Sequence, residues 1–521
     1  MVVLLTITVA LALHLSCHAV MAQDVYEPCP QLPDRSWASE ETIMADSRWV
    51  EAIEQVDRML ANATQAHKLP GLVATVTVGQ RRAWFKGYGK RDARDPTSRP
   101  PAEDDLVWIA SITKTFTSLL LYQMRDDGLV SLDSAVAGFF PGGGFGYRSP
   151  FPTDRPMTLH QLASHTSGLP RETPSVYPIR NKTEAVILAA VKEQWLVNDP
   201  GTRFHYSNLG FSLLGRALGH AAGQSYESLV YSRILQPLGM TTTTFDTPSD
   251  LSGVAIGLTS EGSAGIVHHG DGWGAPCGDL LASSKDMAQW LMLFARRREP
   301  RRVSEDRAER AHQIIDGATL TEMLQPVVML RDGSSAVGSP FEFKYSNGLW
   351  LKSKQGGDPG YRSSITLSED LELGIFFSAL TDPVPEDSVW TIPAADILTK
   401  ALREILWSHQ PRIPIAQPER LVGEYYGNWS VYQVDASTLQ ARLGTHASLL
   451  NLTAFTPLPD TRRSNGTTVV LRAHPTGSAA QAGCRWLDDG SDQELMYFEI
   501  DDKSSRSVSV EFKGSRWFRH R

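Results

Sequence analysis

Three short motifs, far apart in the chain, carry residue types that together could perform acyl transfer. They are Ser111-Ile112-Thr113-Lys114, Tyr206-Ser207-Asn208 and Lys354-Gln355-Gly356. A serine hydroxyl is a poor nucleophile until a neighbouring group takes its proton. The first motif supplies a hydroxyl and an amine, the second a phenol, and the third a second amine. The set therefore predicts a nucleophile, a base and a flanking cation, although each motif alone is weak support.

The first motif predicts a paired hydroxyl and amine on a buried helix. Ser111 and Lys114 are three residues apart, so they share one face of a helix. Residues 115–122 are apolar enough for a core helix, and burial would favour the neutral, proton-accepting form of Lys114. At the helix start, Ser111 would also lie beside exposed backbone N–H groups. The alternative is a solvated serine and lysine on an ordinary surface helix.

The second motif supplies a phenol that can act as a base only if its pKa falls from about 10. A unit charge at ~4 Å contributes about 4 kcal/mol at an effective dielectric constant of ~20. That energy corresponds to about three pKa units, before the cost of desolvation is subtracted. Lys114 and Lys354 are the candidate cations for Tyr206, so the three motifs depend on one another. The alternative for Tyr206 is a hydrogen-bonded tyrosine in a turn.

The tripeptide Tyr-Ser-Asn occurs twice, so one copy must be chosen. The first copy follows residues 200–204 and precedes a predicted helix, which places it on a loop at an element end, where catalytic groups usually lie. The second copy, which begins at Tyr345, lies on what we interpret as a strand next to Lys354. We therefore assign Tyr206 to the site and interpret Tyr345 as structural.

The third motif continues into a second glycine, Gly357, and we expect it to precede a strand near Arg362. Gly356 and Gly357 would let the backbone come close to a bound ester or amide. The N–H groups of Gly357 and Ser111 could then form an oxyanion hole. The alternative is an exposed lysine in a glycine turn.

Taken together, these motifs resemble the serine β-lactamase and penicillin-binding protein superfamily, especially its class C-like branch of esterases and D-aminopeptidase-like enzymes. Residues 162–170, 200–210 and 356–364 resemble family stretches as well, so that the similarity covers about residues 50–405. The resemblance implies an acylated Ser111 with Lys114 as its partner and Tyr206 as general base.

The same resemblance implies that Asn208 contacts substrate and that Lys354 binds a substrate carboxylate or tunes Tyr206. Gln355 stands where the family usually has threonine, which puts carboxylate recognition and a true penicillinase role in doubt. The C-terminal part resembles, more weakly, the barrel-like domains appended to some secreted fungal members.

The elements that would position these motifs predict a mixed α/β fold, with an antiparallel sheet flanked by helices and a small C-terminal all-β domain. The chain has 521 residues, which suggests two domains. We expect a signal peptide (1–22), an N-terminal arm (23–46), a β-lactamase-like catalytic domain (47–410), a proline-rich linker (411–418) and the β domain (419–521). In the catalytic domain we expect helices at 47–66, 111–126 and 394–407, and strands at 72–78, 82–89, 346–351, 362–367 and 373–380. In the β domain we expect strands at 423–429, 438–442, 468–472, 494–499 and 507–512.

The N-terminus and the glycosylation sequons indicate export. An apolar run over residues 2–15 is followed by Val20-Met21-Ala22, which suits signal peptidase. The alternatives are a buried first strand and a membrane anchor. No later segment is apolar enough to cross a membrane. Five Asn-x-Ser/Thr sequons are present, at Asn62, Asn181, Asn428, Asn451 and Asn465. We therefore expect a secreted glycoprotein.

The cysteines allow one disulfide. Cys17 would leave with the signal, and Cys277 lies in an apolar, glycine-rich stretch typical of a buried small residue. That leaves Cys29 and Cys484 as a tentative pair. A three-cysteine metal site is disfavoured, because the chain has no CxxC spacing.

Composition argues against other classes of partner. The net charge of −8 provides no basic surface for nucleic acid. His165 fits a structural loop, and His268-His269 lacks partner acids at metal-ligand spacing, so we expect no metal and no other cofactor. The expected partner is a small-molecule ester, amide or short peptide.

The sequence thus predicts a secreted serine hydrolase or acyltransferase that works through a covalent acyl-enzyme. The alternatives are a D-amino-acid peptidase or β-lactamase and, from another class, an inactive glycosylated binding protein with the same fold. An intact serine, lysine and tyrosine argue against the binding protein, which needs none of the three.

Overall fold

The computed structural model forms two compact units, one of Asp34–His409 and one that includes Gln410–Arg521. The boundary between His409 and Gln410 falls beside the expected end of the catalytic domain. The residues that the structure describes are 32–33, 35–140, 142, 144–152, 155–173, 175, 182–259, 261–265, 272–295, 314–382, 390–410, 418–425, 429–434, 438–443, 448–454, 467–476, 495–501, 506–512 and 515–518.

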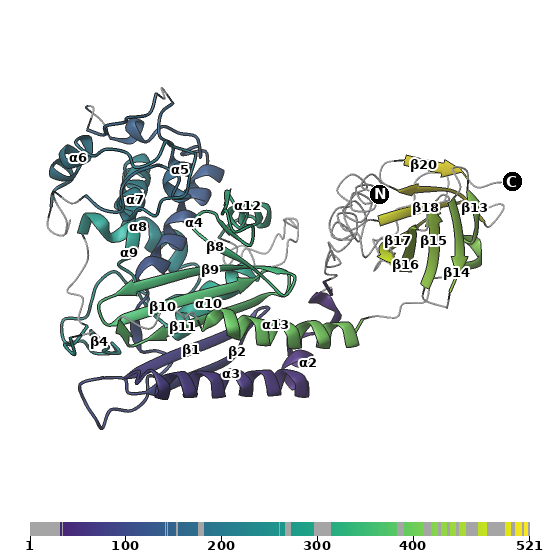
Figure 1. Ribbon diagram of the computed structural model, residues 1–521, viewed down its shortest axis with the longest axis horizontal. Coiled ribbons are helices and arrows are strands. Elements are labelled where there is room, and N and C mark those ends of the chain that lie inside the picture. Colours follow the sequence, from purple (N-terminus) through teal and green to yellow (C-terminus); the bar gives the residue numbers. More distant parts are fainter. Residues whose placement is uncertain are drawn as a thin grey trace, which may run out of the picture. The chain divides into compact units, whose positions relative to one another are not determined.

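The first unit is built on one eight-stranded antiparallel sheet, in the order β2-β1-β11-β10-β9-β8-β7-β6 (Figure 1). Its strands are β1 (Gly71–Val78), β2 (Arg81–Gly89), β6 (Val328–Met329), β7 (Ser335–Val337), β8 (Glu342–Ser346), β9 (Leu349–Asp358), β10 (Tyr361–Ser368) and β11 (Leu373–Ala379). Smaller pairings join β3 (Leu106–Trp108) to β5 (Leu281–Ser283) and β4 (Leu258–Thr259) to β12 (Thr381–Asp382). The fold is the mixed α/β arrangement that the sequence predicts.

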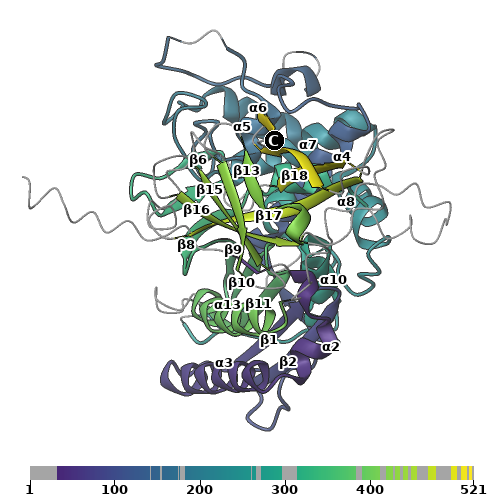
Figure 2. The same cartoon turned by 90° about the vertical axis from the view of Figure 1, so that its right-hand side faces the viewer.

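Helices cover both faces of this sheet. Figures 1 and 2 show α3 (Ser47–Ala66) and α13 (Thr391–Ser408) together on one face, and most of the other helices on the opposite side. The remaining α-helices are α2 (Glu40–Ala45), α4 (Thr113–Asp126), α5 (Leu159–Ala163), α6 (Glu184–Lys192), α7 (Asn208–Ala222), α8 (Tyr226–Val230), α9 (Ala275–Gly278), α10 (Ser284–Phe294) and α12 (Gly317–Met323). Shorter helical turns are η1 (Arg35–Trp37), η2 (Ala110–Ile112), η3 (Val136–Phe139), the π-helical turn η5 (Tyr231–Leu235) and η6 (Gly272–Gly274).

The core explains why α4 is a fixed platform. All residues of α4 from Thr113 to Met124 are buried. Phe116 on this helix stacks on Trp290 of α10 with a ring-centroid distance of 3.7 Å. A helix that is buried all round cannot shift without repacking many neighbours, so residues at its start are held in place.

One expected strand was wrong. The expected strand at 346–351 is a hairpin, because Asn347 and Gly348 adopt φ values of 51° and 79° and reverse the chain between β8 and β9. Asn-Gly is the common sequence of such two-residue turns, since both positions need positive φ. Lys354 lies within the long strand β9, which precedes β10 and its Arg362 as expected, and the alternative of an exposed lysine in a glycine turn does not hold.

The end of the expected N-terminal arm is part of the first unit. Residues 35–45 form η1 and α2, and Ser39 caps α2 by accepting a hydrogen bond from the backbone N–H of Thr42 at 3.2 Å. Arg35 forms ion pairs with Glu40 at 3.2 Å and with Glu372 at 3.4 Å. These contacts tie the segment to the turn before β11.

The second unit contains a separate eight-stranded antiparallel sheet with sequential strand order. Its elements are η7 (Pro418–Arg420), β13 (Gly423–Tyr425), β14 (Trp429–Gln433), β15 (Thr438–Leu443), β16 (Ser448–Ala454), β17 (Thr467–Thr476), β18 (Leu495–Asp501), β19 (Arg506–Phe512) and β20 (Ser515–Phe518). The five strands expected from the sequence correspond to β13, β15, β17, β18 and β19. The strands β14, β16 and β20 were not expected as separate elements.

Candidate active site

The nucleophile candidate, Ser111, lies in a strained turn at the base of α4. It is the middle residue of η2, which leads directly into the helix, and its side chain is partly exposed. The residue before it, Ala110, has φ of 45°, a left-handed conformation that alanine rarely adopts. This turn lifts the Ser111 side chain out of the core while the next turn, with Lys114, is fully buried.

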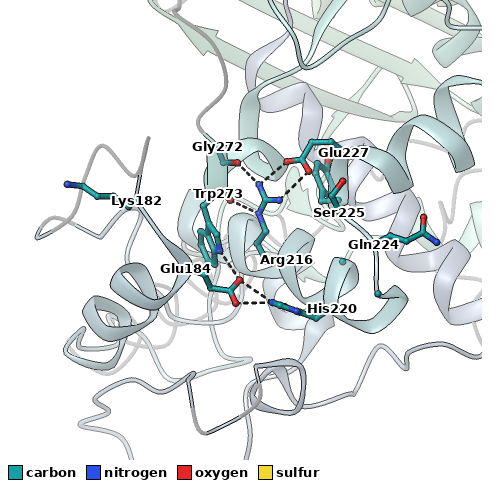
Figure 3. A pocket seen from close by; sticks show the side chains of 12 residues that line it. Lys182, Glu184, Arg216, His220, Gln224, Ser225, Glu227, Gly272 and Trp273 are labelled. Atoms are coloured by element: carbon teal, nitrogen blue, oxygen red, sulfur yellow. Dashed lines mark hydrogen bonds and ion pairs between the residues drawn. The ribbon is translucent and has the colours of Figure 1, made fainter.

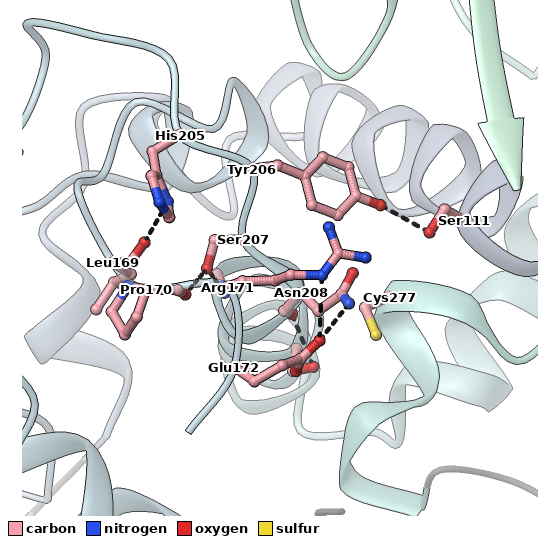
Figure 4. Close-up of polar contacts among 12 residues, drawn as sticks. Ser111, Leu169, Pro170, Arg171, Glu172, His205, Tyr206, Ser207, Asn208 and Cys277 are labelled. Carbon is pink, nitrogen blue, oxygen red and sulfur yellow. Dashed lines mark hydrogen bonds and ion pairs between the residues drawn. The ribbon is translucent and has the colours of Figure 1, made fainter. Parts of the chain in front are cut away.

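The structure brings Ser111, Lys114 and Tyr206 together. The hydroxyl of Tyr206 donates a hydrogen bond to Oγ of Ser111 at 2.7 Å (Figure 4). Nζ of Lys114 donates to the same oxygen at 2.9 Å. The serine oxygen therefore has a phenol and an amine within direct contact, as its activation requires.

Lys114 is buried and its amine contacts three acceptors. Besides Ser111, it donates to Oδ1 of Asn208 at 2.8 Å and to the backbone carbonyl of Cys277 at 2.5 Å. Three acceptors match the three N–H donors of an ammonium group, which offsets the cost of burying the charge. Cys277, the buried cysteine, thus contributes to the site through its backbone.

Two lysines surround Tyr206, as the spacing argument predicts. Nζ of Lys114 lies 4.9 Å and Nζ of Lys354 lies 5.2 Å from the centre of the phenol ring. Burial raises the pKa of Tyr206, but the charges of Lys114 and Lys354 and hydrogen bonds lower it by more, so that the net pKa is below its ordinary value. The environment therefore stabilises the phenolate relative to that of an isolated tyrosine.

Lys354 reaches the site from β9 and is held there by an acid on β8. Its side chain is 2% exposed, and Nζ contacts Oε1 of Glu342 at 2.8 Å. Burial lowers the pKa of Lys354, yet the neighbouring Glu342 and Tyr206 raise it by more, so its net pKa lies above the ordinary lysine value. Lys354 is therefore a fixed cation. Glu342 was not predicted from the sequence, because its pairing with Lys354 depends on the hairpin at Asn347-Gly348, which brings β8 and β9 together.

The glycines after Lys354 lie at different depths. Gly356 is buried, and a Cβ atom there would overlap the carbonyl oxygen of Ile109 and lie 3.1 Å from the backbone nitrogen of Ser111. Strand β9 can thus pack directly on the nucleophile turn only with glycine at this position. Gly357 is exposed and is paired across the sheet with Arg362.

The ring of His165 packs against the ring of Tyr206. The two ring centroids lie 4.4 Å apart, and Nδ1 of His165 accepts the backbone N–H of Ser207 at 3.0 Å. Complete burial and the charges of Lys114, Lys354 and Arg171 hold the pKa of His165 well below its ordinary value. The ring is therefore neutral and acts as a packing surface, consistent with the structural loop expected from the sequence.

Arg171 and Glu172 are site residues that sequence reasoning missed. The guanidinium carbon of Arg171 lies 4.7 Å from the centre of the Tyr206 ring. Oε1 of Glu172 accepts a hydrogen bond from Nδ2 of Asn208 at 2.5 Å (Figure 4). The only signal was their position, directly after the family-like stretch 162–170.

A separate cavity of about 590 Å³ lies at the far end of α7 (Figure 3). Two contacts between polar side chains lie in its wall: Glu184 contacts His220 at 3.0 Å, and Arg216 contacts Glu227 at 2.9 Å. None of the residues of the three motifs lines it. The cavity is thus distinct from the site around Ser111.

Other expectations fall partly outside the described residues. Asn62 is exposed on α3 and Asn451 lies in β16, whereas Asn181, Asn428, Asn465, Cys29, Cys484, His268-His269 and residues 1–22 lie outside them. Within the described part of the chain, no cluster of His, Cys, Asp and Glu is arranged to hold a metal. In the same residues, no helix is long and apolar enough to span a membrane.

The chain is similar to known proteins over most of its length. The family model described as "Beta-lactamase" matches residues 56–397. The chain is 31% identical over 505 residues to beta-lactamase-like protein 2 of Dictyostelium discoideum, which covers 91% of this chain and 87% of that protein. It is 28% identical over 357 residues to the D-alanyl-D-alanine-carboxypeptidase/endopeptidase AmpH of Escherichia coli K12, covering 64% of this chain and 85% of that one.

Solved structures show the same fold. An octameric penicillin-binding protein homologue from Pyrococcus abyssi superimposes with a TM-score of 0.55 at 21% identity, covering 90% of this chain and all (100%) of that one. The family match, the relatives and the fold lead to one conclusion: the chain belongs to the β-lactamase family, whose members are of the serine hydrolase type.

Proposed function

We propose that this protein is a secreted serine hydrolase or acyltransferase that cleaves an ester or amide through a covalent acyl-enzyme on Ser111. The observation that carries the proposal is the double contact of one oxygen. Oγ of Ser111 lies 2.7 Å from the Tyr206 hydroxyl and 2.9 Å from Nζ of Lys114.

In the acylation step, the phenolate of Tyr206 takes the proton of Ser111 as Oγ attacks the substrate carbonyl carbon. Lys114 and Lys354 stabilise the phenolate, and the pKa of Tyr206 is lowered by these two charges despite burial, so that its proton is lost more easily. The oxyanion that forms would lie against the backbone N–H groups of Ser111 and Gly357. The tetrahedral intermediate then releases an alcohol or amine, which receives the proton from Tyr206.

In the second step, water or another acceptor attacks the acyl-enzyme, and Tyr206 removes its proton in the same way. Ser111 regains its proton when the carboxylic acid or the transferred product leaves. All of these proton transfers use one phenol, and no cofactor is required.

Lys354 is the reason for proposing an ester or amide substrate that is not recognised through a carboxylate, rather than a D-peptide that is. In the described structure its charge is already paired with Glu342 at 2.8 Å, and Gln355 stands where a threonine is usual in the family. Both features disfavour a substrate whose affinity depends on a carboxylate at this position. A D-amino-acid peptidase remains the second candidate because a relative, AmpH, carries that activity in its name.

A labelling experiment tests the proposed nucleophile. A fluorophosphonate probe is expected to modify Ser111 in the purified protein, as located by mass spectrometry of tryptic peptides. Ser111→Ala should abolish the label. Ser118→Ala is a matched control, because Ser118 lies on the same helix, is buried and has no hydrogen-bond partner. An unlabelled wild-type protein would support the inactive binding protein instead.

A substrate panel tests the proposed substrate class and acyl acceptor, and a secretion assay tests the proposed export. p-Nitrophenyl esters, D-alanyl peptides and nitrocefin compare the three chemistries, and added alcohols or amines compare hydrolysis with transfer. We expect turnover of the esters to exceed that of the other two. Export and glycosylation predict a mature N-terminus near residue 23 and a mass decrease on treatment with an N-glycosidase; an intact Met1 would contradict the signal.

A further inference from the structure

A continuous line of hydrogen bonds joins a carboxylate on the loop before α6 to the nucleophile. Oε1 of Glu172 accepts from Nδ2 of Asn208 at 2.5 Å, and Oδ1 of Asn208 accepts from Nζ of Lys114 at 2.8 Å. Lys114 in turn donates to Ser111 at 2.9 Å. Glu172 is thus linked to the nucleophile through Asn208 and Lys114.

We propose that Glu172 is a positioning residue that sets the orientation of the Asn208 amide and thereby holds Lys114 against Ser111. The proposal rests on the proposed acyl-enzyme chemistry, but it assigns a role to a residue outside the three motifs.

The physical reason is the asymmetry of an amide side chain. The carbonyl end of Asn208 accepts hydrogen bonds and its NH₂ end donates them, whereas an ammonium group only donates. A flipped amide would place donors of Asn208 against donors of Lys114. An ionised Glu172 only accepts, so it selects the orientation in which the NH₂ group faces the carboxylate and Oδ1 faces Lys114.

The backbone around Glu172 fixes this geometry. The carbonyl of Arg171 accepts the N–H groups of Asn208 at 3.0 Å and Leu209 at 3.1 Å, which are the first two residues of α7. Oγ of Ser207 donates to the carbonyl of Pro170 at 2.7 Å. The backbone next to Glu172 is therefore bound to the start of α7, which keeps the side chain of Glu172 within reach of Asn208.

The charges at the site give Glu172 a second effect. Lys114, Lys354 and Arg171 surround the Tyr206 ring at 4.9, 5.2 and 4.7 Å. Glu342 pairs with Lys354, and Glu172 lies 3.9 Å from Nε of Arg171. Three cations and two carboxylates leave one positive charge, which a Tyr206 phenolate neutralises. Glu172 thus balances the cluster while it orients the amide.

The two ends of the Asn208 amide contact different groups. One amide N–H is used by Glu172 and the carbonyl is used by Lys114, so one N–H is left for a substrate. Asn208 was predicted to contact substrate. In this structure its first role is to link Glu172 to Lys114.

Exchange of donor and acceptor in the pair tests the proposal. Asn208→Asp places two carboxylates face to face and should reduce kcat for the best ester from the panel by about 100-fold or more. Adding Glu172→Gln to that variant restores a donor opposite an acceptor while an oxygen still faces Lys114. We expect kcat of the double variant to be at least about tenfold higher than kcat of Asn208→Asp alone.

Single variants separate positioning from substrate binding. Glu172→Gln keeps the shape but loses the charge, and should lower kcat and the rate of fluorophosphonate labelling by about 10-fold, with KM within about twofold. Thermal unfolding of each variant identifies any that do not fold. Glu369→Gln, which removes the partner of Lys352 at 3.1 Å, is the control for loss of a carboxylate elsewhere in the same unit.

Two results would overturn the proposal. One is labelling of Glu172→Gln at the wild-type rate, and the other is a double variant no more active than Asn208→Asp alone. Failure of the proposed function is distinguishable, because in that case the wild-type protein itself would not be labelled at Ser111.

Discussion

The hydroxyl of Tyr206 donates a 2.7 Å hydrogen bond to Oγ of Ser111, although the two residues are separated by 95 positions in the chain. Tyr206 comes from the loop that starts α7, and Ser111 from the turn that starts α4. The segments that lead into two packed helices thus meet at one oxygen. The predictions below depend on this contact or on the groups that surround it.

Loss of the Tyr206 hydroxyl should remove most of the activity. Tyr206→Phe is expected to lower kcat/KM by about 10²- to 10⁴-fold, because it removes the general base while keeping the ring. Steady-state hydrolysis of a p-nitrophenyl ester measures the change. Tyr345→Phe is the matched control, since Tyr345 belongs to the second Tyr-Ser-Asn copy and is exposed beside Trp350. Full turnover by Tyr206→Phe would show that another group is the base.

The pH dependence should report the Tyr206 phenolate. Burial raises the pKa of Tyr206, but Lys114 and Lys354 lower it by more, so the active form persists below the ordinary tyrosine range. kcat/KM should therefore rise with pH through the lowered pKa and be lost as pH falls below it. The measurement is a pH–rate profile of ester hydrolysis.

Lys354→Gln should move that profile to higher pH, because removing a cation destabilises the phenolate. The control is Lys352→Gln, which removes another buried lysine of β9, one that pairs with Glu369 rather than with Glu342. If Lys354→Gln and Lys352→Gln gave the same acid limb as the wild type, Lys354 would not influence the base.

Glu342→Gln should change substrate preference. In the wild type the Lys354 ammonium is paired with Glu342 at 2.8 Å, so it is not available to a substrate anion. Without that pair, an ester that carries a carboxylate should gain about tenfold in kcat/KM relative to a neutral ester of the same length. The two substrates for this ratio are mono-p-nitrophenyl succinate, which carries the carboxylate, and p-nitrophenyl butyrate, which does not. An unchanged ratio would mean that Lys354 does not face the substrate.

Gly356→Ala should distort the nucleophile turn. The added methyl would overlap the carbonyl of Ile109 and press on the backbone nitrogen of Ser111 at 3.1 Å. We expect a loss of about 1–3 kcal/mol in the free energy of unfolding, together with a large loss of kcat. Gly138→Ala, where an added methyl meets nothing within 4 Å, is the control for both measurements. Wild-type stability and activity in Gly356→Ala would contradict the close packing of β9 on η2.

Local patterns predicted the elements that depend on their own residues. The helix expected at 47–66 is α3, with the same bounds, because an apolar stripe and the capping carboxylate of Asp46 specify it locally. The first hairpin, at 72–89, is also present as β1 and β2. The strand expected at 346–351 did not allow for the hairpin at Asn347-Gly348, although Asn-Gly is a common sequence of two-residue turns.

The candidate catalytic residues could be predicted because their types must occur in fixed local spacings. Ser111 and Lys114 share one helix face, and Tyr206 and Asn208 lie on either side of Ser207, the residue that caps α7. A covalent mechanism needs these groups wherever the rest of the chain places them. The motifs therefore predicted the chemistry without the fold.

The supporting acids could not be found in the same way. Glu342 reaches Lys354 across a hairpin over 12 positions, and Glu172 reaches Asn208 over 36 positions. Sequence alone predicted the candidate groups for the chemistry and much of the secondary structure, because helix and strand periodicity and catalytic spacing are local properties. Only the tertiary structure decided which carboxylate faces which cation, because strand register and the packing of loops on helix ends bring together residues whose separation in the chain carries no pattern.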